Sequence, residues 1–283
     1  MTKCYMFLKQ DWCGLRWSEW IPFENGVSRV PSSSGLYRVK PRANTKLIYI
    51  GQTSNLKQRV RVLISEIKKP VMPFRDPHNG APCLWVWQKE EGYTYEYSFS
   101  EVENNNVLRK AYEHYLFWKY RLEYGESPNC SFGKFHRSYV ISSNSSRGIH
   151  GCRLENQTNN AGLDSHKPLQ LCGRYSDENW MGLNWIEPLK LEYDEVTDLE
   201  NKPAVYKIFT GQELLYIGET NELKCRMKDH LDKTWQTLEV YFSYSIQDTN
   251  ILPHQLKEIE NDLIAACFEQ EKRVPLFQFQ NHR

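Results

Sequence analysis

The chain has 283 residues, of which 40% are hydrophobic and 13% aromatic, and this length accommodates one large domain or two modest ones. Its 36 basic and 35 acidic residues give a formal charge of +1, which excludes a strongly basic protein that attracts nucleic acid through its overall field. Any nucleic-acid contact must therefore use local patches. The opening segment, MTKCYMFLKQDW, lacks the apolar core of a signal peptide, and no run of about 18 apolar residues predicts a membrane span. We therefore expect a cytoplasmic protein without membrane contact.

The first predicted elements are a hairpin and a helix. Gly35–Lys40 and Lys46–Gly51 are short β-rich runs, and the residues between them, PRANT, are typical of a turn. The next segment predicts a helix because apolar residues recur at the spacing of one helical stripe: Leu56, Val60, Leu63, Ile64 and Ile67. Arg59 lies at the edge of that stripe, beside the sheet that the helix is expected to cover.

An insertion, a strand, a long helix and a polar segment follow. The insertion Pro70–Gly92 carries turn-forming Pro and Gly residues and has no counterpart later in the chain. Tyr93–Phe99 is predicted as a strand and Val107–Tyr124 as a helix. The segment from Ser142 to Asn179 is rich in Ser, Asn, Gln and Gly, which is typical of an irregular linker or a long surface excursion.

The second half of the chain repeats the first. GLYRV followed by LIYIGQTSNLKQR is echoed by AVYKI followed by LLYIGETNELKCR. Tyr37 corresponds to Tyr206, an offset of 169 residues (206 − 37), and Tyr49 corresponds to Tyr216, an offset of 167 (216 − 49). The repeat predicts a first module over residues 1–141, a linker over 142–179 and a second module over 180–283.

The second module is predicted to have the same elements as the first. They are the strands Pro203–Phe209 and Glu213–Gly218, a helix with the stripe Leu223, Met227 and Leu231, a strand over Leu238–Ser245 and a long helix over His254–Gln270. Each module is thus expected to be a small antiparallel sheet flanked by helices, an α+β fold.

The eight cysteines are scattered through the chain and form no CxxC pair. This pattern favours reduced, mostly buried thiols. A structural zinc site assembled from distant cysteines and histidines is the alternative.

The repeated motifs resemble the GIY-YIG nuclease superfamily, which includes homing endonucleases, the nuclease of bacterial excision repair and some type II restriction enzymes. The first copy reads GLY then YIG, the second reads AVY then YIG, and an arginine follows each motif on the next helix. The likeness covers roughly Ser34–Lys134 and Pro203–Gln280. It implies two tandem GIY-YIG modules that hydrolyse phosphodiester bonds of DNA with Mg²⁺ or Mn²⁺.

The resemblance also implies roles for individual residues. The motif tyrosines, one of which orients the attacking water or takes its proton, are Tyr37, Tyr49, Tyr206 and Tyr216. Arg59 and Arg226 match an arginine whose planar charged fork suits a phosphate that gains negative charge in the transition state. Glu113 and Glu260 match the metal-binding glutamate of the later helix, where a carboxylate would hold one Mg²⁺.

The two copies depart from the family pattern in different places. Many members carry a histidine four residues after the arginine; the second copy keeps it as His230, whereas the first copy has Leu63 and could recruit His78 from its insertion. The family's asparagine near the module end corresponds to Ser131 in the first copy and to Gln278 in the second. Asn129 could replace Ser131 through a shift in register.

Three functions are compatible with these residues. The leading hypothesis is a restriction-type endonuclease in which each module cuts one strand, so that a monomer acts as a pseudo-dimer on DNA. The alternatives are a structure-specific or repair nuclease with a single active module, and a non-catalytic DNA-binding protein that retains the fold. Base recognition is expected to involve the insertion or the linker, where variable loops can be carried on a fixed scaffold.

Overall fold

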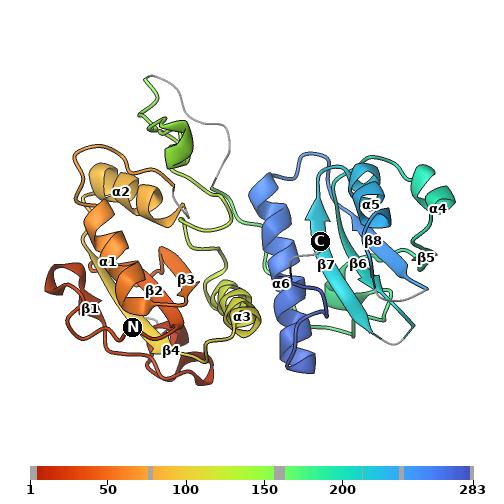
Figure 1. Cartoon of the computed structure of the whole chain (residues 1–283), viewed down its shortest axis with the longest axis horizontal. Helices are drawn as coiled ribbons and strands as arrows, with labels where there is room; N and C mark the ends of the chain where they lie inside the picture. The colour runs from red at the N-terminus through yellow and green to blue at the C-terminus, as the bar shows by residue number, and fades with distance from the viewer. Residues whose placement is uncertain (1–4, 76–78, 156–162, 212, 236–238, 281–283) are drawn as a thin grey trace. The chain divides into compact units, whose positions relative to one another are not determined.

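The computed structural model describes residues 5–75, 79–155, 163–211, 213–235 and 239–280 (Figure 1). Contacts within the chain divide it into two compact units. The first unit comprises Met1–Arg109 and Lys119–Ser165, and the second comprises Lys110–Trp118 and His166–Arg283. The middle of one helix, Lys110–Trp118, therefore belongs to the second unit although the sequence repeat assigns it to the first module.

The first unit contains a four-stranded sheet with the strand order β1-β4-β2-β3, in which every neighbouring pair is antiparallel. Its strands are β1 Ile21–Pro22, β2 Gly35–Pro41, β3 Tyr49–Thr53 and β4 Tyr95–Glu101. The α-helices of the predicted first module are α1 Leu56–Glu66, α2 Gly80–Glu91 and α3 Asn106–Tyr124. Short 3-10 turns occupy Met6–Leu8, Trp12–Gly14, Phe23–Asn25 and Ser145–Arg147.

The second unit contains a sheet of the same form, with the strand order β5-β8-β6-β7 and antiparallel neighbours. Its strands are β5 Leu189–Lys190, β6 Ala204–Phe209, β7 Leu214–Thr220 and β8 Tyr241–Ile246. Its helices are the 3-10 turn Trp180–Gly182, α4 Tyr193–Thr197, α5 Leu223–Leu231 and α6 Pro253–Glu271. The predicted α+β class, with two antiparallel sheets flanked by helices, is confirmed.

The glycine of each YIG motif is required by the packing of the hairpin. Tyr37 pairs with Gly51 across β2 and β3, and Tyr206 pairs with Gly218 across β6 and β7. A Cβ atom added to either glycine would collide with the phenol of the paired tyrosine. The absence of a side chain therefore lets the tyrosine ring lie flat across the neighbouring strand.

The helix after each hairpin begins with the first residue of its apolar stripe, Leu56 in α1 and Leu223 in α5. The side chain of Asn55 caps α1 by accepting a hydrogen bond from the backbone N–H of Gln58 (2.9 Å). Leu56 and Leu63 of α1 are fully buried, as are Leu223 and Met227 of α5. The apolar stripe of each helix is thus buried against the sheet, as predicted. Arg59 and Arg226 lie next to these stripes, so the packing of the helices holds both arginines beside the sheet.

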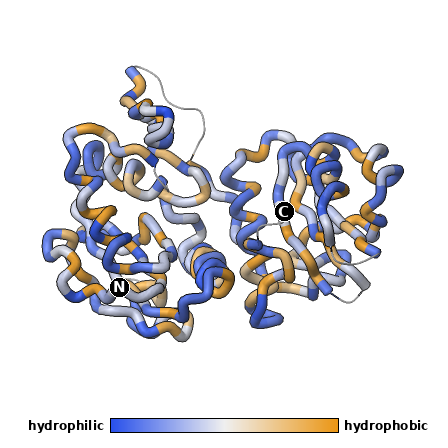
Figure 2. Tube along the Cα trace, in the orientation of Figure 1, coloured by the Kyte–Doolittle hydropathy of each residue, from blue (hydrophilic) through white to orange (hydrophobic). Residues whose placement is uncertain are grey.

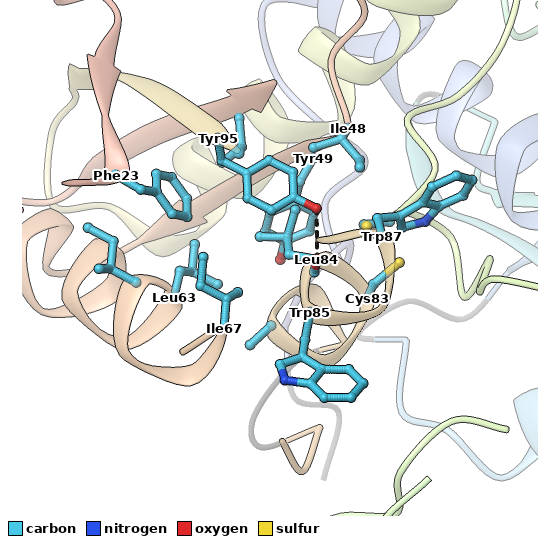
Figure 3. Close-up of a cluster of buried hydrophobic side chains, with 14 of the residues drawn as sticks. Phe23, Ile48, Tyr49, Leu63, Ile67, Cys83, Leu84, Trp85, Trp87 and Tyr95 are labelled. Carbon is cyan, nitrogen blue, oxygen red and sulfur yellow. Dashed lines mark hydrogen bonds between the residues drawn. The ribbon is translucent and has the colours of Figure 1, made fainter. Parts of the chain in front are cut away.

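Helix α2 of the insertion is part of the core of the first unit. Its first eight residues are all buried, and the Tyr95 hydroxyl donates a hydrogen bond to the Leu84 carbonyl (2.7 Å). Figure 3 shows Tyr49 and Tyr95 within the same apolar cluster as Leu84 and the two tryptophans of α2. This part of the insertion therefore supplies packing, whereas the sequence suggested a variable loop.

The described residues of the polar segment, 142–155 and 163–179, have mostly irregular backbone apart from the 3-10 turn Ser145–Arg147, and they make specific contacts within each unit. In the second unit, the backbone N–H of His166 donates to the Glu258 carboxylate (2.7 Å), and that of Leu169 donates to the Asp262 carboxylate (3.0 Å). Both carboxylates lie on buried positions of α6. The backbone of this segment thus supplies a hydrogen bond to one oxygen of each of these buried acids.

Within the described ranges, no helix is long and apolar enough to cross a membrane. Figure 2 shows hydrophilic and hydrophobic residues alternating along the strands and helices of both units.

Candidate active site

The hairpin of each unit places its two motif tyrosines on one face of the sheet. In the second unit Tyr206 pairs with Gly218 and Ile208 pairs with Tyr216, so the tyrosines are diagonal neighbours. Their ring centroids lie 6.1 Å apart. Tyr37 and Tyr49 have the same relation in the first unit, with ring centroids 5.8 Å apart. The spacing of the GxY and YIG motifs therefore produces a tyrosine pair.

In the second unit, Arg226 and His230 of α5 both hydrogen-bond to one tyrosine. Arg226 Nε donates to the Tyr206 hydroxyl (2.9 Å), and that hydroxyl lies 2.9 Å from His230 Nε2. The phenol can donate its proton to the imidazole nitrogen while its oxygen accepts from the guanidinium, when the histidine tautomer leaves Nε2 without a proton. The predicted residues Tyr206, Arg226 and His230 thus form one hydrogen-bonded chain.

Burial keeps the phenols of Tyr206 and Tyr216 protonated. Burial and the neighbouring Tyr216 raise the pKa of Tyr206 well above its ordinary value, although Arg226 acts in the opposite direction. Burial and Glu260 likewise raise the pKa of Tyr216. Tyr206 is therefore a neutral phenol at physiological pH and has a proton that it can donate to His230.

Glu260 of α6 lies beside the tyrosine–arginine group and near a second carboxylate. The backbone N–H of Glu219 acts to lower the pKa of the Glu260 carboxylate. Burial and the Glu219 carboxylate raise the pKa of Glu260 to about 8, while Lys257 and Arg226 act to lower it. Both glutamates are half-buried and keep some access to solvent.

This donor set fits a divalent cation. Carboxylate oxygens are the ligands that Mg²⁺ and Mn²⁺ prefer, and a cation would compensate two acids whose proximity disfavours their ionisation. Among the described residues, no group of three or more His, Cys, Asp or Glu side chains is arranged to hold a metal. A cation at Glu260 would therefore complete its coordination with water and substrate oxygens, as Mg²⁺ commonly does.

The equivalent residues of the first unit are more enclosed. Arg59 Nε donates to the Tyr37 hydroxyl (2.8 Å), and Arg59 Nη2 lies 3.4 Å from the Tyr49 hydroxyl. Tyr37 and Tyr206 are both almost fully buried, at 1% and 0% exposed, so the difference lies at the other two positions. Tyr49 and Arg59 are each 9% exposed, whereas Tyr216 and Arg226 are half-buried. By contrast, the Arg226 side chain of the second unit is 35% exposed.

One feature of the first unit changes the chemistry of this group, and a second encloses it. The fully buried side chain of Leu63 stands at the position that corresponds to His230. At the start of α2, a Cβ atom added to Gly80 would lie 2.8 Å from ring atoms of Tyr49, so the helix is in direct contact with that ring. The tyrosine pair is therefore covered by apolar side chains and by the inserted helix (Figure 3).

The remaining predicted residues differ in what they do. Glu113 is half-buried and lies in the part of α3 that belongs to the second unit, whereas Tyr37, Tyr49 and Arg59 belong to the first. His78 lies outside the described residues.

The Gln278 side chain hydrogen-bonds to the backbone of strand β7. Its side-chain oxygen accepts from the Ile217 N–H (3.1 Å), and its side-chain nitrogen donates to the Ile217 carbonyl (3.2 Å). Ser131 and Asn129 of the first unit are buried. The Cys130 N–H donates to the Ile48 carbonyl (3.0 Å), and the Phe277 N–H donates in the same way to the Leu215 carbonyl (2.9 Å), so Ser131 and Gln278 are structurally equivalent.

Two contributors to the second-unit site were not predicted. Trp235 donates from Nε1 to the His230 carbonyl (3.1 Å), and its ring centroid lies 6.5 Å from that of Tyr216. Glu219 is the other, and its only signal in the sequence is the change from YIGQ in the first copy to YIGE in the second. Its importance depends on proximity to Glu260, which no local pattern reveals.

The cysteines described by the structure are free thiols, and they belong to buried and exposed positions alike: Cys13, Cys83, Cys130, Cys152, Cys172, Cys225 and Cys267. Burial and hydrogen bonding to Cys83 raise the pKa of the Cys130 thiol well above its ordinary value. Cys130 is therefore a protonated packing residue.

Comparison of the chain with protein-family models, curated proteins and solved structures found no match. The resemblance to GIY-YIG nucleases accordingly rests on the repeated motifs alone.

Proposed function

We propose that this protein is a metal-dependent DNA endonuclease that hydrolyses phosphodiester bonds, with its working centre in the second unit. The observation that carries the proposal is the chain of hydrogen bonds from Arg226 through Tyr206 to His230. Phosphodiester hydrolysis needs a group that accepts the proton of water and a cation that stabilises the phosphate charge. In this proposal Tyr206 and His230 supply the first and Arg226 supplies the second.

The hydrogen-bonded chain provides a route for the proton of the attacking water. A neutral phenol is a weak base, because it must first lose its own proton. Tyr206 avoids this difficulty by passing its hydroxyl proton to His230 Nε2 as its oxygen accepts a proton from water. The imidazole then carries the positive charge at a nitrogen that titrates near neutrality in its ordinary state.

Arg226 is placed to bind the scissile phosphate. Its Nε donates to Tyr206, its Nη1 lies 3.7 Å from the Asp229 carboxylate, and its side chain is 35% exposed. Lys233 adds a second cation, with Nζ lying 5.6 Å from the centroid of the Tyr216 ring. Fixed cations of this kind stabilise the negative charge that grows on phosphate oxygens during attack.

Glu260 is the proposed ligand of a divalent cation. When bound, Mg²⁺ or Mn²⁺ would supply Lewis-acid polarisation of the phosphate and stabilise the leaving oxygen. The half-buried carboxylate of Glu260 provides a hard oxygen donor beside Tyr216 and Arg226. DNA is proposed as the substrate on the basis of the family resemblance.

The tandem repeat supports two arrangements of the cut. In a restriction-type scheme each module cuts one strand, and a monomer does the work of a homodimer. In the single-site scheme only the second unit cuts, which the enclosure of Tyr49 and Arg59 and the presence of Leu63 favour. We propose the single-site scheme, in which the second unit nicks one strand of the DNA.

A plasmid-cleavage assay tests the function and separates the arrangements. Wild type, Glu113→Ala, Glu260→Ala and the double variant would be incubated with supercoiled DNA in Mg²⁺, in Mn²⁺ and with chelator. We expect metal-dependent cutting that Glu260→Ala abolishes and Glu113→Ala preserves. Nicking by each single variant with linearisation by neither would establish one strand per module. Binding of DNA without cutting of any duplex or branched substrate would establish the non-catalytic alternative.

A further inference from the structure

A lysine is buried on the face of the second sheet that is opposite the tyrosine pair. Lys207 stands between Tyr206 and Ile208 on β6, so its side chain points to the other face of the sheet, and it is 3% exposed. Its Nζ donates a hydrogen bond to the Tyr175 carbonyl (2.5 Å) and lies 4.3 Å from the centroid of the Trp185 ring. These contacts hold the ammonium at a fixed place on this face.

The first unit has a different cation at the equivalent position. Arg38 pairs with Ser98 of β4 as Lys207 pairs with Ser243 of β8. The guanidinium of Arg38 donates to three acceptors, which are the carbonyls of Phe7 (2.6 Å) and Lys9 (2.9 Å) and the hydroxyl of Ser98 (3.3 Å). The centroid of the Trp20 ring lies 4.8 Å from its Cζ. Arg38 is therefore fully enclosed and serves packing.

The second unit has a cavity beside its lysine. Pro188 stands where the first unit has Trp20, at the offset of 168 residues (188 − 20) that also relates Trp185 to Trp17 (185 − 17). The smaller proline leaves a space of about 300 Å³, whose lining includes Lys207, Trp185, Ile186, Pro188, Phe209 and Ser243. In the first unit Trp20 lines a cavity too, but Arg38 is not among the described residues around it. The second unit alone thus presents its buried cation to a cavity.

The ammonium of Lys207 has capacity for a ligand in this cavity. Of its three N–H groups, one donates to the Tyr175 carbonyl, and the described residues provide no second hydrogen-bond acceptor. Burial lowers the pKa of Lys207 from 10.5 to about 8, although Asp177 acts to raise it. The buried charge is therefore only partly compensated, and an anionic oxygen in the cavity would stabilise it.

We propose that this cavity binds a small monocarboxylate with an apolar or aromatic body, whose carboxylate accepts hydrogen bonds from Lys207. The side chains of Ile186, Pro188 and Phe209 form apolar walls for the body of such a compound. The volume fits a single ring, since sites for small molecules run from roughly 300 to 1,000 Å³. A buried cation at the apolar wall of a small cavity is the arrangement that orients a ligand of this class.

Acidic side chains limit the charge that the ligand carries. Asp177, Glu178 and Glu187 are exposed residues that also line the cavity. Their like charge disfavours polyanions such as phosphate esters, whereas one carboxylate is matched by one ammonium. The site is on the sheet face opposite Tyr206, so it is independent of the proposed nuclease centre.

Benzoate is the probe that tests the site in the full chain. Its affinity would be measured by ligand-observed NMR on wild type, Lys207→Met, Pro188→Trp and Lys190→Met. Pro188→Trp introduces the residue of the first unit and should fill the cavity while keeping the lysine. Lys190→Met is the control of matched charge, because this exposed lysine of β5 is not among the lining residues. We expect both cavity variants to weaken benzoate binding by at least about tenfold and the control to leave it unchanged.

A neutral analogue and unfolding temperatures complete the test. Benzamide has nearly the shape of benzoate without its charge, so it should bind at least about tenfold more weakly. Pro188 is exposed, so Pro188→Trp should unfold near the wild-type temperature and remains informative if Lys207→Met does not fold. Failure of wild type to bind benzoate, phenylacetate and hexanoate would overturn the proposal. Unchanged benzoate affinity in a folded cavity variant, or equal affinity for benzamide, would overturn it too.

Discussion

The two units have the same hairpin and the same tyrosine–arginine contact but surround them differently. In both, an arginine Nε donates to the first motif tyrosine, at 2.8 Å for Arg59 and 2.9 Å for Arg226. The second unit adds His230 to the phenol, whereas the first has Leu63 there. The contact between arginine and tyrosine therefore holds the fold in either case, and the neighbouring residues decide whether proton transfer is available.

The surroundings also differ in access. The inserted α2 packs on Tyr49 in the first unit, while Tyr216, Arg226 and Glu260 of the second unit keep partial exposure. Burial strengthens hydrogen bonds within a cluster but excludes a bulky, charged substrate. A repeat can thus preserve the scaffold of a site in both copies and retain an accessible site in one.

The largest expected effect comes from making the second unit resemble the first. His230→Leu removes the acceptor of the Tyr206 proton, so cutting should slow by about 10²- to 10⁴-fold, the usual contribution of acid–base catalysis. Single-turnover cleavage of a labelled duplex in Mg²⁺ would measure the rate. Leu63→His in the first unit is the reciprocal control and should leave the rate unchanged. Wild-type cutting by His230→Leu would refute the proton route through Tyr206.

A second prediction sharpens what the units share. Gly51→Ala and Gly218→Ala each force a Cβ atom against the paired tyrosine, and overpacking of this kind typically costs about 1–3 kcal/mol. Thermal or urea unfolding should show both variants destabilised to a similar degree. Gly211→Ala is the control, because a Cβ atom added there meets nothing within 4 Å. A loss confined to one of the two motif variants would show that the hairpins are not equivalent.

A third expected effect concerns pH in the absence of metal. The pKa of Glu260 is raised from 4.5 to about 8, so the folded protein retains a proton that the unfolded chain releases. The free energy of unfolding should therefore fall as pH rises from about 4.5 to about 8. Unfolding temperatures in chelator at pH 5 and pH 8 would show this fall, and Glu260→Gln should reduce it. Identical pH dependence in wild type and Glu260→Gln would contradict the raised pKa.

Most of the fold followed from short-range patterns in the sequence. The apolar stripes predicted α1 and α5, and the β-rich runs predicted both hairpins within a few residues of their observed bounds. Helix α2 was missed because it has no polar face over its first two turns: its buried residues include Cys83, Leu84, Val86 and Trp87. Apolar residues on all sides of a helix give no alternation between an apolar and a polar face in the sequence. Pro and Gly near its start also pointed to a loop.

The candidate site was predicted in part for a similar reason. The four-residue spacing of Arg226 and His230 places both side chains on one face of a helix, and the hydrogen bonds to Tyr206 confirm that proximity. Glu219 escaped notice because its proximity to Glu260 depends on the packing of α6 against β7. Contacts between elements that are distant in sequence have no local signature.

The two hydrogen bonds between the Gln278 amide and the backbone of Ile217 have a consequence for association between molecules. β7 is the edge strand of its sheet, and an unpaired edge offers N–H and C=O groups to a strand of another chain. Leu276 and Phe277 donate their backbone N–H groups to Leu214 and Leu215, and the Gln278 amide occupies both polar groups of Ile217. The edge that carries Tyr216 is thereby closed to edge-to-edge aggregation at these positions.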